Sequence, residues 1–111
     1  MKKPDALATL SALAQENRLD VFRLLVEAGP DGMAAGQIAA KLLLAPNALT
    51  FHLDRLRETG LVTVRRAGRS MIYAARFDAM NALVAYLTDQ CCGGRPDLCK
   101  PARPLRKAAA S

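Results

Sequence analysis

The sequence is short of the residues on which several protein classes depend. Tryptophan is absent, aromatic residues make up 5%, and His52 is the single histidine, so one chain cannot build a multi-histidine zinc or nickel site. No apolar run approaches the roughly 18 residues that a membrane-spanning helix needs. The three cysteines are an odd number clustered within nine positions, which excludes a paired disulfide framework. We therefore expect a cytoplasmic protein with no membrane partner.

The chain also lacks the spacing patterns of enzymes. It contains no recognisable set of nucleophile, base and orienting group, and no glycine-rich phosphate-binding loop. Its 111 residues are the size of one ordinary domain, which excludes a large multidomain enzyme. We expect neither catalysis nor a catalytic cofactor.

Positive charge is in excess but is unevenly distributed. Sixteen Lys and Arg against ten Asp and Glu give a formal net charge of +6, typical of a protein that binds a polyanion. Residues 91–111 hold five bases and one acid, or +4, which leaves +2 for residues 1–90. Charge alone therefore favours nucleic acid only weakly for the first ninety residues.

Hydrophobic spacing predicts a mainly α fold with a β-hairpin wing. Helical spacing with stop signals covers five segments: Pro4–Ala14, Glu16–Ala28, Ala34–Leu42, Pro46 to before Gly60, and Phe77 to about Asp89. In the first segment the apolar stripe is Leu7, Leu10, Leu13 and Ala14. The β-branched runs Leu61–Arg66 and Ser70–Ala74 predict a hairpin with a basic tip. This order, ααααββα, is that of a winged helix-turn-helix in residues 1–90. We expect residues 91–111 to be a flexible basic tail with a cysteine site, with little fixed structure beyond Gln90 in the absence of a ligand.

The helix predicted from Pro46 is placed to enter a major groove of DNA. Because Leu49, Leu53 and Leu56 would face the core, the opposite side faces outward. There Asn47 and Thr50 can bond to base edges, Phe51 can contact a thymine methyl group, and Arg55 can reach a guanine or a phosphate. His52 either contacts DNA or packs beside the helix pair. The candidate DNA-binding residues are Asn47, Ala48, Thr50, Phe51, His52 and Arg55 in the helix, and Arg65, Arg66 and Arg69 in the wing.

The same residues also fit a solvated helix face and an ordinary hairpin kept soluble by its arginines. Asp54 and Glu58 count against DNA binding, because they would repel a phosphate that they faced directly. The position of three arginines in a wing next to a helix pair favours DNA.

The sharpest local signal is the segment from Cys91 to Cys99, which reads CCGGRPDLC. Its two glycines let the chain fold back, so that Cys99 can meet both Cys91 and Cys92. Soft sulfur donors select soft metals and metalloids, whereas structural zinc normally takes a fourth Cys or His. Three thiolates suit a pyramidal ion: trivalent arsenic or antimony, with lead or bismuth as lesser candidates. A disulfide redox switch and incidental thiols in a disordered tail are the alternatives.

Four segments together resemble the ArsR/SmtB family of metal-responsive winged-helix repressors. They are Leu13–Leu19, Pro46–Leu56, Gly60–Val62 and Arg66–Tyr73, within a similarity that covers about residues 6 to 90. The resemblance implies a homodimer built from the first and last helices, so that residues 1–90 form a DNA-binding and dimerisation domain. It also implies that the dimer binds operator double-stranded DNA, represses transcription, and leaves the DNA when an inducer binds.

The chain departs from several branches of that family. It has no Cys-x-Cys pair near Ala34 and Gly36, where some arsenic sensors carry one, and no histidine in residues 77–90, where zinc and nickel sensors hold ligands. It is similar to the arsenic-responsive branch with a Cys-Cys pair and a third Cys beyond the last helix, which implies Cys91, Cys92 and Cys99 as metal ligands. Ala45 stands where a capping Ser or Asn is common, which leaves the start of the DNA-facing helix less well fixed.

The sequence therefore predicts a dimeric repressor that responds to As(III) or Sb(III). Two alternatives stay open at this point. One is a thiol redox-sensing regulator on the same scaffold, and the other is a small module that binds nucleic acid or a partner nonspecifically.

Overall fold

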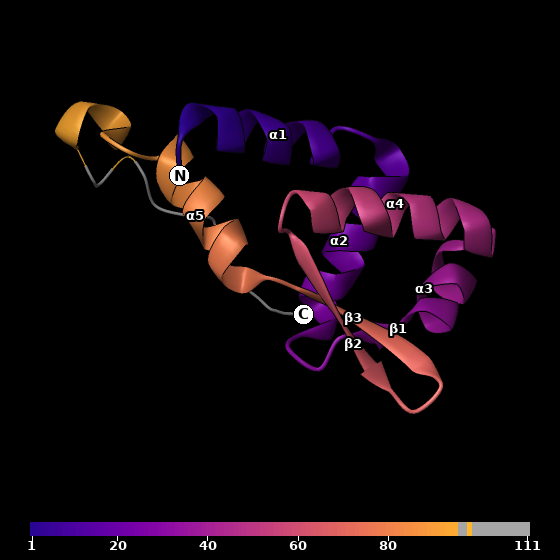
Figure 1. The fold of residues 1–111 in the computed structure, drawn as a ribbon. Helices are drawn as coiled ribbons and strands as arrows, with labels where there is room; N and C mark the ends of the chain where they lie inside the picture. Colours follow the sequence, from indigo (N-terminus) through magenta and orange to yellow (C-terminus); the bar gives the residue numbers. More distant parts are fainter. Residues whose placement is uncertain (96–97, 99–111) are drawn as a thin grey trace.

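A winged helix-turn-helix is formed by the part of the chain that the computed structural model describes, residues 1–95 and 98 (Figure 1). Its helices are α1 (Lys3–Leu13), α2 (Glu16–Ala28), α3 (Ala35–Leu42), α4 (Pro46–Glu58) and α5 (Phe77–Leu87). Its strands are β1 (Met33–Ala34), β2 (Val62–Ala67) and β3 (Ser70–Ala75). The predicted order ααααββα is confirmed, with two additions. Strand β1 was not predicted, and a short 3-10 helix, η1 (Cys91–Gly94), stands where little fixed structure was expected.

Strand β1 attaches the wing to the helices. The strands form an antiparallel sheet in the order β1-β3-β2, with Met33 opposite Tyr73 and Ala34 opposite Ile72. The side chain of Arg65 in β2 donates a hydrogen bond to the carbonyl oxygen of Asp31, with an N···O distance of 3.1 Å. The base of the wing is therefore fixed to the loop between α2 and α3.

Glycine 32 makes this attachment possible, and its replacement tests it. Gly32 has a φ of +73°, and a Cβ there would collide with the carbonyl oxygen of Tyr73. We expect Gly32→Ala to lower the free energy of unfolding by about 2–4 kcal/mol, because strained backbone and steric overlap add. The control Gly36→Ala lies within α3 with open space around it, and should raise stability by up to about 1 kcal/mol. If urea denaturation gave the same change in the free energy of unfolding for Gly32→Ala and Gly36→Ala, the close approach of this loop to β3 would be contradicted.

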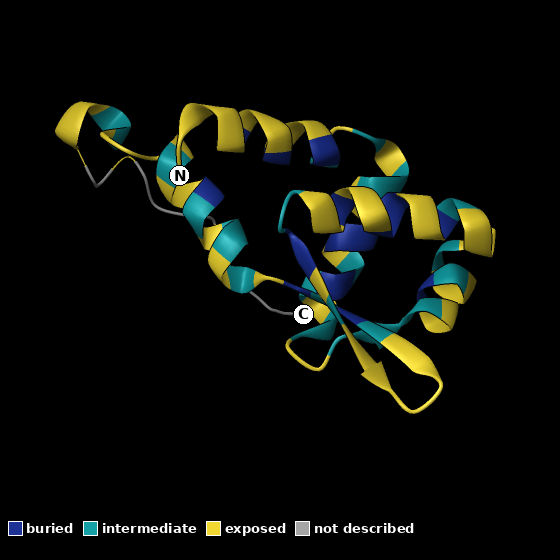
Figure 2. Cartoon of the chain, in the orientation of Figure 1, coloured by how far each residue is buried: buried dark blue, intermediate teal, exposed yellow. Residues whose placement is uncertain are grey.

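The hydrophobic core lies where α2, α3, α4 and the sheet meet. Figure 2 shows buried positions along the inner sides of α2 and α4. As predicted, α4 buries Leu49, Leu53 and Leu56. The largest side chains removed from solvent are Val21, Leu25, Ile38, Leu49, Leu53, Leu56 and Leu61. This core holds α4 with its opposite side outward.

Helix α1 turns Leu7 and Leu10 away from that core, which the sequence did not indicate, whereas Leu13 packs against the core. Its buried residues are Ala6, Thr9 and Ala12, whereas Leu7 is 60% exposed and Leu10 is 39% exposed. On the neighbouring helix α5, Val84 and Leu87 are exposed as well. A single chain thus leaves Leu7 and Leu10 of α1 and Val84 and Leu87 of α5 exposed, while Leu83 is buried.

None of the helices within residues 1–95 is both long enough and apolar enough to cross a lipid bilayer.

Candidate nucleic-acid interface

The first turn of α4 is fixed by its own polar side chains. Pro46 occupies the first helical turn, where its missing N–H costs no hydrogen bond. Ala45 provides no side-chain cap. Instead, Oδ1 of Asn47 accepts from the backbone N–H of Ala48 at 3.0 Å, and the Thr50 hydroxyl donates to the carbonyl oxygen of Pro46 at 3.0 Å. Both residues keep further hydrogen-bonding capacity for a base edge.

The outward side of α4 carries most of the predicted DNA-binding residues. Asn47, Thr50 and Arg55 are exposed, and Phe51 is exposed to 56%. Ala48 is half-buried, so it contributes less surface than expected. We call the exposed residues Asn47, Thr50, Phe51, Asp54, Arg55 and Glu58 the recognition face. It combines hydrogen-bonding groups, an arginine and an apolar ring, which is the set of groups that reads base edges in a major groove.

Each acid on the recognition face has an arginine partner three residues away. Nη1 of Arg55 lies 3.5 Å from a carboxylate oxygen of Glu58, and Nη1 of Arg57 lies 3.6 Å from one of Asp54. Arg55 also places its Cζ 5.7 Å from the centre of the Phe51 ring. The two carboxylates are therefore partly neutralised, which weakens the argument from sequence that they would repel DNA.

His52 does not belong to the recognition face, and the expectation that it contacts DNA is corrected. It is only 8% exposed, and its ring meets the Phe51 ring edge-on with centroids 5.8 Å apart. Among the described residues its Nδ1 has no hydrogen-bond partner. Burial, and then the positive charge of Arg18, lower the pKa of His52 below its usual 6.5, so the ring is neutral at pH 7. His52 packs beside the helix pair, as the other interpretation of the sequence had it.

The wing arginines differ in how far they are engaged. Arg65 is bound to the carbonyl oxygen of Asp31, and Nε of Arg66 donates to the carbonyl oxygen of Gly68 at 3.2 Å. Arg69, in the turn between β2 and β3, forms no hydrogen bond or ion pair with the described residues. All three are exposed. Arg69 is therefore the wing residue best placed to reach a phosphate or a minor groove.

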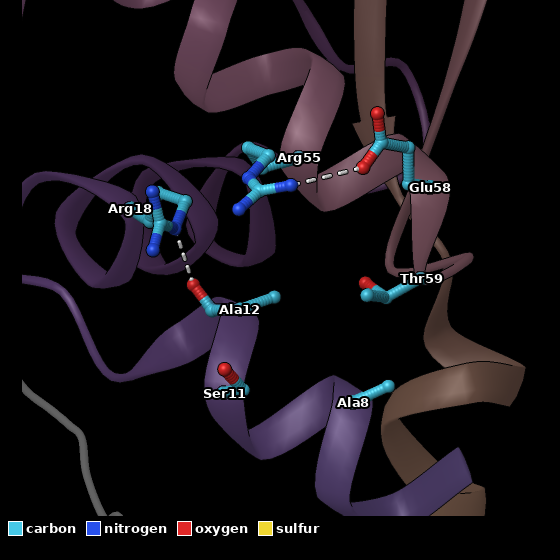
Figure 3. Close-up of a pocket in the computed structure, with 7 residues that line it drawn as sticks. All are labelled: Ala8, Ser11, Ala12, Arg18, Arg55, Glu58 and Thr59. Carbon is cyan, nitrogen blue, oxygen red and sulfur yellow. Dashed lines mark hydrogen bonds and ion pairs between the residues drawn. The ribbon is translucent and has the colours of Figure 1, made fainter.

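A cavity of about 220 Å³, lined in part by Arg55, lies between α1, the start of α2 and the end of α4 (Figure 3). Arg18 lines it and was not a predicted site residue. Its Nε donates to the carbonyl oxygen of Ala12 at 2.7 Å, which ties the last turn of α1 to the first turn of α2. A cation in the first turn of a helix opposes the helix dipole, and this is the sequence signal that marks Arg18 as unusual. The cavity residues are Ala8, Ser11, Ala12, Arg18, Arg55, Glu58 and Thr59.

The cysteine pair lies at the far end of α5 from the wing (Figure 1). The Sγ atoms of Cys91 and Cys92 are 3.0 Å apart, and both residues are half-buried free cysteines. The backbone N–H of Cys91 donates to the carbonyl oxygen of Thr88 at 2.9 Å, and Cys92 has a φ of +61°, which non-glycine residues rarely adopt. Cys99 lies outside the described residues, among which no cluster of three metal-binding side chains occurs.

Comparisons with known proteins agree with this architecture. A family of helix-turn-helix domains matches residues 13–65. The HTH-type transcriptional regulator YgaV of Escherichia coli is 31% identical over 78% of this chain and 86% of its own length. An ArsR-like transcriptional regulator from a Rhodococcus species has a similar structure, with a TM-score of 0.67 and 26% identity over 76% of each chain. So does a homodimeric winged helix-turn-helix domain from Mycobacterium bovis, a possible ArsR-family regulator, with a TM-score of 0.64 and 27% identity over 78% of this chain and 81% of that one.

Proposed function

Because the chain belongs to the ArsR/SmtB-like family of winged helix-turn-helix transcriptional regulators, we propose that it is an arsenite-responsive repressor. In this proposal it binds operator DNA as a homodimer and is released when As(III), or Sb(III), binds to Cys91, Cys92 and Cys99. The members of this family bind DNA and are not enzymes. The finer assignment, to a trivalent metalloid, rests on the cysteines.

The observation that carries the metalloid assignment is the pair of thiols 3.0 Å apart at the end of α5. Sulfur atoms this close can share one soft ion, and partial burial favours covalent sulfur ligands over water. Arsenous acid, As(OH)₃, exchanges each hydroxyl for one thiolate with release of one water per thiol. Cys99, seven residues beyond Cys92, supplies the third sulfur in the proposal.

The homodimer is supported by the uncovered apolar side chains of α1 and α5. Leu7, Leu10, Val84 and Leu87 are large exposed residues on two helices that contact one another. Large apolar side chains exposed on two contacting helices are what an interaction surface presents. The similar domain from Mycobacterium bovis is homodimeric. Residues 1–90 are thus proposed as the DNA-binding and dimerisation domain, and residues 91–111 as the tail that holds the cysteine site.

Release from DNA requires that the inducer bind the DNA-free arrangement more tightly than the DNA-bound one. The route is short, because Cys91 is hydrogen-bonded to the last turn of α5 and α5 packs against α1. A ligand that draws the sulfurs together can therefore shift the helices of the proposed dimer contact, and with them the spacing of the two α4 helices. A typical coupling of about 1–3 kcal/mol corresponds to a 5- to 150-fold loss of DNA affinity.

Thiol counting on the reduced full-length protein tests the metalloid site. One equivalent of arsenite per chain is expected to protect all three cysteines from a thiol reagent, without any oxidant. Protection of no cysteine by equimolar arsenite would contradict the proposal.

A redox regulator is the second candidate, because two free thiols lie in contact, with Sγ atoms 3.0 Å apart. A disulfide between these adjacent residues would be strained, since consecutive Cα atoms are closer together than those of ordinary disulfides. In that case two thiols lose two protons and two electrons to a peroxide, which is reduced to two waters. Loss of DNA binding with peroxide but not with arsenite, and its recovery with dithiothreitol, would favour this candidate. Equal binding to all DNA sequences would favour a nonspecific nucleic-acid-binding module instead.

A further inference from the structure

We propose that Phe51 and Arg55 act as one unit that reads a thymine and a guanine in neighbouring base pairs of the operator, at most two steps apart. The Phe51 ring would contact the C5-methyl group of the thymine, while the Arg55 guanidinium would donate to O6 and N7 of the guanine. This proposal rests on the proposed function, because it requires α4 to enter a major groove. It adds a sequence step that the operator must contain.

The two side chains are already coupled without DNA. Arg55 follows Phe51 by four residues, so both lie on the same side of α4, and side chains of a helix lean toward its N-terminus. The Arg55 Cζ accordingly lies 5.7 Å from the centre of the Phe51 ring. The guanidinium is thereby drawn back toward the N-terminal half of α4, the half of a recognition helix that contacts base edges.

Each member of the unit also has a second partner. The edge of the His52 ring, which is buried, supports the Phe51 ring at a centroid distance of 5.8 Å and an angle of 64°. The carboxylate of Glu58 lies 3.5 Å from Nη1 of Arg55. A ring in contact with a buried side chain and a guanidinium with two partners lose less freedom on binding, so their contacts with DNA are preorganised.

The chemistry of the pair matches two base edges. Thymine is the one base that presents a methyl group in the major groove, and guanine is the one that presents two acceptors to a bidentate arginine. Successive base pairs are about 3.4 Å apart along the axis. The 5.7 Å between guanidinium and ring is more than one such step and less than two. A pair of this spacing laid along the groove can therefore reach two different base pairs, adjacent or next but one, which we call neighbouring.

Arg57 offers a matched control on the same helix. Like Arg55 it is about half-exposed and forms an i,i+3 ion pair, in its case with Asp54 at 3.6 Å. It has no aromatic partner among the described residues. The substitution Arg→Lys keeps the positive charge and removes the planar guanidinium at either position. Only at Arg55 does it also remove the contact with the Phe51 ring.

The experiment uses an operator selected from random DNA with the full-length wild-type protein. Thymine→uracil, which removes only the methyl group, is expected to weaken wild-type binding about fourfold. Guanine→7-deazaguanine, which removes N7, should weaken it about tenfold. In Phe51→Ala, uracil should no longer weaken binding, and 7-deazaguanine should weaken it less than in wild type. Arg55→Lys should lose the response to 7-deazaguanine, and Arg57→Lys should keep both responses.

The possible results separate this proposal from the function on which it rests. A selected operator with no neighbouring thymine and guanine would overturn the unit while leaving sequence-specific binding intact. The unit would also be overturned if uracil and 7-deazaguanine each caused the same loss of affinity in wild type, Phe51→Ala and Arg55→Lys. Failure to select any preferred sequence would overturn both. Circular dichroism and binding to unrelated DNA show that each variant is folded.

Discussion

Removing the polar groups of the first turns of α4 is expected to abolish most of the preference for the operator. In the double variant Asn47→Ala, Thr50→Val, affinity for the selected operator should fall about 10- to 100-fold, because two side chains that bond to base edges are lost. Affinity for unrelated DNA should change less than twofold, since phosphate contacts supply nonspecific binding. Fluorescence anisotropy with both DNAs measures the two affinities.

The wing supplies the contrasting variant. Arg69→Ala should weaken binding to both DNAs and reduce the salt dependence of binding, with the slope changing by about 0.9 for each Arg69 that contacts a phosphate. Arg23→Ala is the control, because Arg23 is an exposed arginine of α2 paired with Glu27, away from α4 and the wing in sequence. If the double variant weakened binding to unrelated DNA as much as to the operator, the recognition face would not be reading sequence.

Replacing the cysteines is expected to remove the response to arsenite and nothing else. In the triple variant Cys91→Ser, Cys92→Ser, Cys99→Ser, operator affinity without inducer should stay within twofold of wild type, because Cys91 and Cys92 lie at the far end of α5 from the wing and no cysteine belongs to the recognition face. The 5- to 150-fold loss of affinity that arsenite causes in the wild type should disappear, so that the triple variant binds the operator equally well with and without arsenite. Each single variant should show a weaker response than wild type, because each removes one sulfur.

A variant with all thiols present separates the ligand role from a change in the end of α5. Thr88→Ser alters the residue whose carbonyl oxygen accepts from Cys91 but keeps its hydroxyl and all three cysteines. Its arsenite response should equal that of wild type. A single Cys→Ser variant with an unchanged response would show that its sulfur is not a ligand.

The sequence predicted the elements whose ends depend on local chemistry. Helix α2 runs from Glu16 to Ala28 as expected, because Gly29 and Pro30 stop it. Helix α4 begins at Pro46, and its leucines at 49, 53 and 56 face the core as the spacing requires. These features depend on residues that are near one another in the chain.

The features that were missed depend on residues far apart in the chain. Strand β1 has only two residues, too few for any periodic signal, and it forms because Gly32 lets the loop approach β3. In α1, spacing identified a helix but not its buried side, because small residues pack inward and Leu7 and Leu10 stay exposed. His52 lies on the flank of the helix wheel, where spacing does not separate a buried ring from a DNA contact.

In the candidate site, too, the sequence predicted which residues are present and which point outward, but not all of the contacts between their side chains. Cys91 and Cys92 are adjacent in sequence, and the structure shows that their sulfurs lie within 3.0 Å of one another. The ligand role of Cys99 stays a prediction from the sequence pattern. For the recognition face, the sequence indicated which residues point outward, but the pairing of Arg55 with Phe51 and Glu58 required the structure.

The most direct test of the account is a titration of arsenite into the reduced wild-type protein bound to its labelled operator, followed by anisotropy. We expect the DNA to be released as arsenite approaches one equivalent per chain, and the triple Cys→Ser variant to stay bound throughout. Release of DNA by arsenite binding to the cysteines would be contradicted if the wild-type complex stayed intact in excess arsenite. It would also be contradicted if the triple variant released DNA at the same arsenite concentration as wild type.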